Sequence, residues 1–168
     1  MRPQLYRNLR GQGFAEIPGD ALGSFFQKRF LGRGLATLDW NRDGRADFAV
    51  SNLHDPFSLV TNQTRSNHQP LVIKLAGRTG SREPIGATVR MQANGRDQFR
   101  LYTGGDGYLV SNEHRMTFWV PATQKTVDIE VRWPGGKLER WQGIGPGNEY
   151  LLIEGTHRAT ILRQFAQN

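Results

Sequence analysis

Residues 39–47 form an acidic loop, and this loop constrains the fold more than any other feature of the chain. Its sequence is Asp-Trp-Asn-Arg-Asp-Gly-Arg-Ala-Asp, so oxygen-bearing side chains recur at alternate or near-alternate positions around one glycine. A calcium ion takes about six to eight oxygen ligands, and a loop can supply them by turning every second side chain inward while its glycine permits a sharp turn. The loop therefore predicts a calcium site whose ligands are the side chains of Asp39, Asn41, Asp43 and Asp47 and the backbone carbonyl of Arg45.

The flanks of the acidic loop indicate strands rather than helices. An EF-hand needs a glutamate at the twelfth position of its loop, and that position is Val50 in this chain. The apolar runs at residues 34–38 and 47–50 are also too short for EF-hand helices. We therefore expect a loop between two β-strands. An Asx-rich turn that binds no metal is the alternative, because Asp, Asn and Gly also dominate ordinary turns.

Short apolar segments recur along the rest of the chain and predict an all-β fold. Val, Ile, Phe and Trp are frequent in these segments, and 20 glycines favour tight turns between them. After a polar linker at residues 64–69, we expect eight strands, at residues 71–75, 87–91, 99–103, 108–110, 116–120, 127–133, 138–141 and 150–153. This number of strands favours an antiparallel β-sandwich or a barrel. We expect helical pieces only at residues 21–28 and 158–165.

Two segments that lie 54 residues apart resemble each other. Leu-Tyr-Arg-Asn at residues 5–8 and Leu-Val-Thr-Asn at residues 59–62 both place an apolar pair before a polar residue and an asparagine. A period of about fifty residues is typical of β-propeller blades, but a closed ring needs at least about four of them. The chain holds barely one such unit. We therefore expect the end of an array, or a single unit that buries its apolar face on another part of the protein.

These motifs carry two resemblances to known families. The run at residues 34–50, which includes the acidic loop, resembles the FG-GAP or VCBS repeat of integrin-like β-propellers, whose DxNxDGxxD loop binds calcium. Three further segments resemble the ASPIC/UnbV domain, which usually follows such repeats in secreted proteins of the cartilage acidic protein type. They are Pro-Ile-Gly-Ala-Thr-Val at 84–89, Gly-Gly-Asp-Gly-Tyr-Leu at 104–109 and Val-Arg-Trp-Pro-Gly-Gly at 131–136.

The resemblance implies a domain organisation and a function. It places an FG-GAP/VCBS-like calcium-binding repeat, as a β-hairpin or partial propeller blade, at residues 1–63. An ASPIC/UnbV-like antiparallel β-sandwich follows at residues 70–154, and a C-terminal tail at residues 155–168. It implies calcium ligation by the loop residues named above and assigns no catalytic residue. We therefore expect a non-catalytic, calcium-binding module for adhesion or ligand presentation, with a protein or glycan ligand outside the cell.

Two alternative functions stay open. Trp40 lies inside the acidic loop, and Trp119 stands where the ASPIC/UnbV pattern has glycine, so both are candidates for exposed rings that stack on a ligand such as a sugar. Trp133 and Trp141 lie in strand-like segments and are expected in the core. A carbohydrate-binding module is thus the first alternative. A metal-dependent hydrolase is less favoured, because the predicted ligands nearly fill a calcium shell and no motif positions a nucleophile.

Composition narrows the partners and the location. The net charge of +7 comes from scattered basic residues without a nucleic-acid-binding motif, so no specific nucleic-acid partner is expected. The chain has no cysteine, which excludes disulfides, and no apolar stretch of about eighteen residues, so no membrane span is expected. Calcium loops of modest affinity suit the calcium-rich space outside the cytosol, so we expect an extracellular or periplasmic location. The first residues lack the apolar core of a signal peptide, so a leader would lie upstream.

Overall fold

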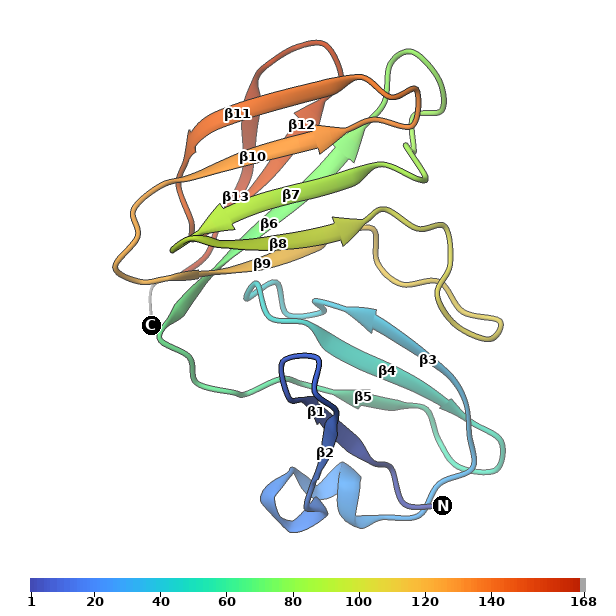
Figure 1. Cartoon of the computed structure of the whole chain (residues 1–168). Helices are drawn as coiled ribbons and strands as arrows, with labels where there is room; N and C mark the ends of the chain where they lie inside the picture. Colours follow the sequence, from blue (N-terminus) through green and yellow to red (C-terminus); the bar gives the residue numbers. More distant parts are fainter. Residues whose placement is uncertain (167–168) are drawn as a thin grey trace.

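The computed structural model describes residues 1–166 and divides them into two β regions (Figure 1). We call residues 1–66 the N-terminal region and residues 67–166 the sandwich. Apart from two short 3-10 helices, the regular structure of the described residues is β-strand. The predicted all-β fold is therefore confirmed.

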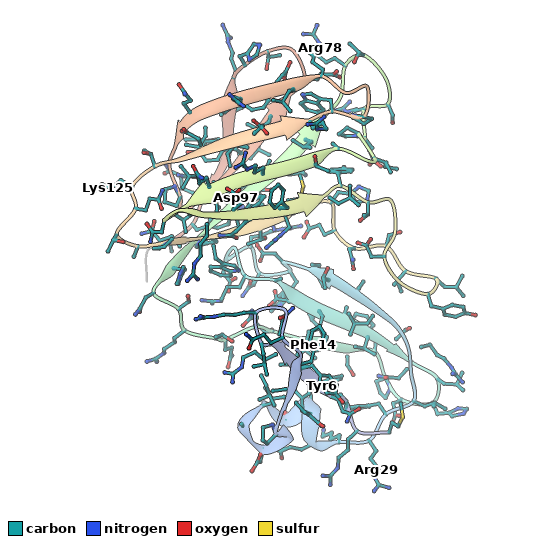
Figure 2. The ribbon with its side chains drawn as sticks, in the orientation of Figure 1. Tyr6, Phe14, Arg29, Arg78, Asp97 and Lys125 are labelled. Carbon is teal, nitrogen blue, oxygen red and sulfur yellow. The ribbon has the colours of Figure 1, made fainter. Side chains whose placement is uncertain are left out.

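The N-terminal region contains a hairpin, two 3-10 helices and a three-stranded sheet. The hairpin pairs β1 (Leu5–Asn8) with β2 (Phe14–Ile17), and the 3-10 helices are η1 (Gly19–Ala21) and η2 (Ser24–Gln27). The sheet is an antiparallel meander of β3 (Gly32–Leu38), β4 (Asp47–Asn52) and β5 (Ser58–Val60). Because the acidic loop connects β3 to β4, the prediction of a loop between two strands is confirmed. Tyr6 and Phe14 project from the hairpin and are at least half exposed (Figure 2).

The sandwich consists of two four-stranded sheets. The first has the order β11-β10-β7-β8, with β7 (Thr88–Ala93), β8 (Arg96–Leu101), β10 (Val127–Arg132) and β11 (Leu138–Ile144). The second has the order β13-β12-β6-β9, with β6 (His68–Ala76), β9 (Met116–Pro121), β12 (Asn148–Ile153) and β13 (Ala159–Gln164). Neighbouring strands are antiparallel except for β6 and β12, which are parallel.

Buried and more exposed residues alternate along the strands, and the buried ones form the core between the two sheets. In β10, Val127, Ile129 and Val131 are buried, and the residues between them are more exposed. This is the pattern of a strand with one face inside. One continuous cluster joins side chains of both sheets, and it includes Trp133 and Trp141, which are 1% and 4% exposed. The expected core position of these two tryptophans is confirmed.

Side chains link β8 and β9, the edge strands on one side of the sandwich. Nε2 of Gln98 donates to the carbonyl of Trp119 at 2.9 Å, and Nε of Arg100 donates to the carbonyl of Thr117 at 3.1 Å. An edge strand with unpaired backbone groups invites pairing with other chains, and these bonds occupy two such groups. They also fix the backbone of Trp119. Its neighbour Phe118 points into the core, so Trp119 lies on the outer face.

Of the two predicted helical pieces, the one at residues 21–28 is present only as short 3-10 helices, and the one at residues 158–165 is wrong. Residues 21–28 contain the 3-10 helix η2 and the end of η1, and Gly23, in extended conformation, separates the two. Residues 158–165 contain strand β13, which pairs with β12. Apolar residues at 161, 162 and 165 imitate a helical spacing, but the open edge of β12 offers backbone hydrogen bonds that decide the conformation. The segment expected as a tail therefore completes the second sheet, and residues 167–168 of that prediction lie outside the described residues.

The predicted strand at residues 108–110 is also wrong. This segment is the tip of a loop that contains one isolated bridge, between Gly107 and Val110. Tyr108 and Leu109 are 74% and 87% exposed there, so their apolar character reflects no buried face. The other seven predicted strands of the sandwich are present, with shifted ends. The polar linker is shorter than expected, because β6 already begins at His68.

Candidate metal centre at the junction of the two regions

The acidic loop is wound around its first aspartate. Oδ1 of Asp39 accepts a hydrogen bond from the N–H of Asp43 at 3.0 Å, and Oδ2 accepts one from the N–H of Gly44 at 2.9 Å. Gly44 has φ +85°, a backbone conformation that favours glycine. Asp39 is only 5% exposed. Its carboxylate therefore serves as the internal support of the turn.

Asp47 ties the end of the loop to its beginning and to the segment after β5. Oδ2 of Asp47 accepts from the N–H of Trp40 at 3.2 Å, and Oδ1 accepts from the N–H of Asn62 at 2.7 Å. Burial raises the pKa of Asp47 in spite of these two hydrogen bonds, and the nearby charges of Asp43 and Asp39 add to the effect. Asp47 thus feels the negative charges of the other two loop carboxylates.

Asp43 is the middle carboxylate of the loop and lies closer to solvent. Its Oδ1 accepts from the N–H of Arg45 at 2.8 Å, and its Oδ2 accepts from the guanidinium of Arg45 at 2.6 Å and from Nδ2 of Asn41 at 2.8 Å. Its side chain is 22% exposed. A cation at this loop would therefore compete with Arg45 for this carboxylate.

Arg115 joins the acidic loop to the sandwich. Its Nη1 donates to Oδ2 of Asp39 at 2.8 Å, while Nε and Nη2 form a two-pronged pair with the carboxylate of Glu149 on β12, both at 2.9 Å. The side chains of Arg115, Asp39 and Glu149 are 5%, 7% and 8% exposed. Burial alone would lower the pKa of Arg115, but the bonds to Glu149 and Asp39 outweigh burial and raise it. Arg115 therefore remains charged and links the two regions.

The segment before Arg115 runs along the free edge of β3. The N–H of Glu113 donates to the carbonyl of Thr37 at 2.9 Å, and the N–H of Thr37 donates to Oδ1 of Asn112 at 2.8 Å. The N–H of Asp39 donates to Oε2 of Glu113 at 3.0 Å, and Arg42 forms an ion pair with the same carboxylate. The sandwich thus satisfies backbone groups of β3 that a neighbouring strand would otherwise bond.

Two glycines permit the close approach of the regions. A Cβ atom at Gly34 on β3 would lie 2.5 Å from Cγ1 of Val110, and one at Gly44 would lie 2.5 Å from Cγ of Pro70 on β6. Real Cβ atoms do not approach other atoms so closely. Along β3 and at the tip of the acidic loop, the backbone of the N-terminal region therefore lies directly against side chains of the sandwich.

The predicted ligands lie in one loop, but their carboxylates do not converge as a ready-made cage. Within residues 1–166, no group of three or more His, Asp or Glu side chains is placed to hold a metal ion. The donor chemistry nevertheless fits a divalent cation, because five carboxylates at the junction face only three guanidinium groups. The carboxylates are Asp39, Asp43, Asp47, Glu113 and Glu149, and the guanidinium groups are Arg42, Arg45 and Arg115. Calcium binding would require Asp43 to turn away from Arg45.

Sequence reasoning does not find Arg115, Glu113 and Glu149. Arg115 is 76 positions from Asp39 and 34 from Glu149, so no local spacing connects these residues. The only available hint was the excess of basic residues, which the sequence distributes evenly. Their role follows from the fold, because it brings the start of β9 and the start of β12 against the acidic loop.

A groove of about 380 Å³ lies between the acidic loop and the outer face of the sandwich. Trp119, Pro70 and Phe165 form its apolar wall, and Asp43, Arg45, His68 and Gln69 are among its polar lining. Trp40 does not line this groove; it is 49% exposed, and its Nε1 donates to Oγ1 of Thr61 at 2.9 Å. The two predicted stacking residues therefore belong to different surfaces, and Trp119 alone lies in a concave one.

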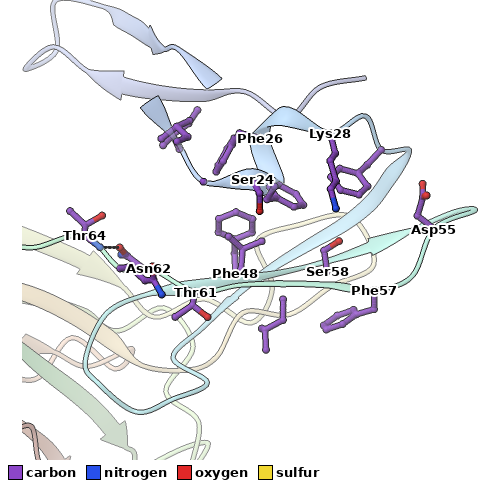
Figure 3. Close-up of a pocket in the computed structure, with 18 of the residues that line it drawn as sticks. Ser24, Phe26, Lys28, Phe48, Asp55, Phe57, Ser58, Thr61, Asn62 and Thr64 are labelled. Carbon is purple, nitrogen blue, oxygen red and sulfur yellow. Dashed lines mark hydrogen bonds between the residues drawn. The ribbon is translucent and has the colours of Figure 1, made fainter. Parts of the chain in front are cut away.

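A larger hollow, of about 1260 Å³, opens inside the N-terminal region (Figure 3). Phe25 and Phe26 of η2 pack against Phe48 of β4, with ring centroids 5.5 Å and 6.2 Å from that of Phe48. Strand β5 and the residues on either side of it line the hollow. The aromatic cluster closes one side of the sheet only in part.

Comparison with known proteins supports the second of the two resemblances. Residues 77–159 match the family model described as ASPIC and UnbV. The match begins directly after β6 and ends at the first residue of β13, so it omits two strands that complete the second sheet. No curated protein matches the chain. The resemblance of residues 34–50 to the FG-GAP or VCBS repeat stays a prediction. None of the helices found in residues 1–166 is long and apolar enough to cross a membrane.

Proposed function

We propose that this chain, which carries an ASPIC and UnbV segment at residues 77–159, is a non-catalytic calcium-binding β module of an exported protein. Its role would be adhesion or ligand presentation. The observation that supports the proposal is the surplus of carboxylates at the junction of the two regions, where three of the five belong to the acidic loop. Because Asp39 is bonded to the loop backbone and to Arg115, a change in the loop reaches the sandwich directly.

Calcium would act on the loop as a structural ion. Asp39, Asn41, Asp43 and Asp47 would hold it with the carbonyl of Arg45, and its charge would offset the two negative charges that the arginines leave uncompensated. An ion that binds the folded chain stabilises it by mass action. The consequence would be a rigid junction and a fixed orientation of the surfaces on both sides of it.

A calorimetric calcium titration of chelator-stripped protein tests the metal. We expect one site of roughly micromolar to millimolar affinity, the range of extracellular calcium modules and sensors. Asp43→Asn should weaken binding at least about tenfold, since it removes one anionic ligand. Asp97→Asn is the matched control, because Asp97 pairs with Arg90 within the first sheet and not with a residue of the loop. Absence of heat in the wild-type chain would leave the loop as an Asx-rich turn.

The exported location and the adhesive role need their own test. Fractionation of cells that produce the natural protein should place it outside the cytosol, where free calcium is high enough for a loop of modest affinity. Binding of the chain to extracellular matrix or surface proteins should require calcium and should be lost in Asp43→Asn. Recovery of the protein in the cytosolic fraction would contradict the location.

A second candidate function is the binding of a neutral saccharide in the Trp119 groove. The charges of Asp43 and Arg45 pair with each other, and the other polar groups of the groove include amides and hydroxyls. A tryptophan wall with neutral hydrogen-bonding groups at a domain junction suits a sugar ring. A glycan array read with calcium and with chelator tests this. Trp119→Ala should abolish a signal that Trp40→Ala leaves intact; equal signals in both variants would remove this candidate.

A further inference from the structure

Strand β5 has one side without a backbone partner. It pairs with β4 through Ser58, Leu59 and Val60, and it ends the sheet order β3-β4-β5. Within residues 1–166, no other strand pairs with its second side. At the opposite edge of the same sheet, Thr37 of β3 is bonded by residues 112 and 113 of the sandwich. The sheet therefore has one covered edge and one open edge.

The N-terminal hairpin contains a strand, β1, that resembles β5 in sequence and is paired with β2. Residues 5–8 form β1 and resemble residues 59–62, which begin within β5. β1 is paired antiparallel with β2, and the register places Ile17 opposite Leu5 and Ala15 opposite Arg7. Since β4 occupies one side of β5, a strand equivalent to β2 can occupy only the other. The internal repeat thus contains a pairing in its first copy that its second copy lacks.

The surroundings of β5 offer apolar surface to an added strand. The hollow described above lies beside β5, with Phe26 and Phe48 among its lining residues (Figure 3). Leu59 and the neighbouring Phe57 also line it and are 43% and 65% exposed. A strand with alternating side chains would cover part of this apolar surface while its backbone bonds to β5.

We propose that β5 is an acceptor for an extended peptide strand of another polypeptide, which pairs with it antiparallel as β2 pairs with β1. Transfer of the β2 register gives the side-chain requirement. A β-branched apolar residue lies opposite Leu59, as Ile17 does opposite Leu5, and a small residue lies opposite Thr61, as Ala15 does opposite Arg7. The acidic loop contacts residues 61 and 62, just after β5, but it contributes no strand to this pairing, so we expect the peptide to bind without calcium.

The test uses the chain's own donor sequence as a probe. A synthetic peptide of residues 12–18, Gln-Gly-Phe-Ala-Glu-Ile-Pro, is titrated into the isotope-labelled full chain in the presence of chelator. We expect saturable amide shift changes at residues 57–62 of the protein. Two backbone-methylated peptides serve as controls, one methylated at the residues equivalent to 15 and 17 and one at 14 and 16. One of them should bind at least about tenfold more weakly, because alternate residues of a strand bond to opposite sides.

A pair of variants ties the binding to β5. Leu59→Lys adds a charge at the open edge and should weaken binding at least about tenfold, since edge lysines oppose strand addition. Leu35→Lys is the matched control, because Leu35 is 51% exposed on β3, whose outer side is covered. No saturable shift at about millimolar peptide, or equal binding by both variants, would overturn the proposal. A dimer of the free chain that Leu59→Lys dissociates would also overturn it, by making a second copy the occupant.

Discussion

The sandwich and the N-terminal region bury apolar side chains to very different extents. The sandwich has one continuous core cluster of nineteen buried residues, whereas the buried hydrophobic residues of the N-terminal region are Phe26 and Val50. A hairpin and a three-stranded sheet with so little buried surface are marginal in water. Two further buried residues of the N-terminal region are Asp39 and Asp47, both in the acidic loop. The comparison indicates that this region depends on its polar junction with the sandwich more than on a core of its own.

The largest difference between the regions should appear when a phenylalanine is removed from each. Phe118 is fully buried between the sheets, so Phe118→Ala should lower the free energy of unfolding by about 3–5 kcal/mol. Phe57 is 65% exposed, so Phe57→Ala should change it by no more than about 0.5 kcal/mol. Urea unfolding followed by circular dichroism measures both. Equal losses would mean that the two regions share one core.

The next largest effect concerns the junction. Arg115→Met leaves two carboxylates, Asp39 and Glu149, without their cation in a buried place, and the cost of breaking such a pair is about 3–5 kcal/mol. Arg140→Met is the control, because Arg140 is 69% exposed beside Glu130 and such pairs contribute about 0–1 kcal/mol. Limited proteolysis of Arg115→Met should cut the N-terminal region first. Cleavage that starts in the sandwich would contradict a junction role for Arg115.

A polar contact that lies entirely within the sandwich should have an effect of intermediate size on the free energy of unfolding. Oε2 of Glu154 accepts from the N–H groups of Arg78 and Thr79, and these bonds lower the pKa of Glu154 to about 2. Since the folded pKa lies below the usual value of 4.5, this stabilisation is present above about pH 4.5 and is lost as pH falls towards 2. At neutral pH, Glu154→Gln should cost about 2 kcal/mol.

The difference between wild type and Glu154→Gln should shrink as pH is lowered through that window, measured as urea midpoints at several pH values. A difference that stays constant from pH 6 to 3 would show that the carboxylate charge does not matter.

The smallest predicted effect tests the close contact between β3 and the loop at residues 107–110. Gly34→Ala places a methyl group 2.5 Å from Cγ1 of Val110, so the loop must move, at a cost of about 1 kcal/mol or somewhat more. Gly23→Ala meets no atom within 4 Å and should be neutral or slightly stabilising. Thermal melting measures both. A neutral Gly34→Ala would mean that the contact between the regions is loose.

Sequence patterns predict the elements whose conformation is decided locally. The alternation in residues 127–133 identifies β10, and the turn chemistry of the acidic loop identifies its flanking strands. The patterns mislead where pairing with a segment distant in the sequence decides the conformation. β13 has the apolar spacing of a helix and becomes a strand because β12 offers it an edge, and Tyr108 is apolar but lies at an exposed loop tip.

The candidate site also combines local features, which the sequence predicts, with long-range contacts, which it does not. The predicted ligands of the loop are neighbours in sequence and can be named from it, as can the turn at Gly44. Arg115 and Glu149 reach the loop only through the packing of the second sheet, so sequence spacing cannot connect them. The prediction of Trp119 as a stacking residue stays untested, although the groove beside it gives that residue a concave surface.

Amide hydrogen exchange in the wild-type chain and in Arg115→Met tests the dependence of the N-terminal region on the junction most directly. We predict that the amides of Asp39, Asp43 and Gly44 are protected in the wild type and lose that protection in the variant. Core amides such as that of Val131 should stay protected in both. Unchanged protection of the loop amides in Arg115→Met would contradict the account, because the loop would then be held without the sandwich.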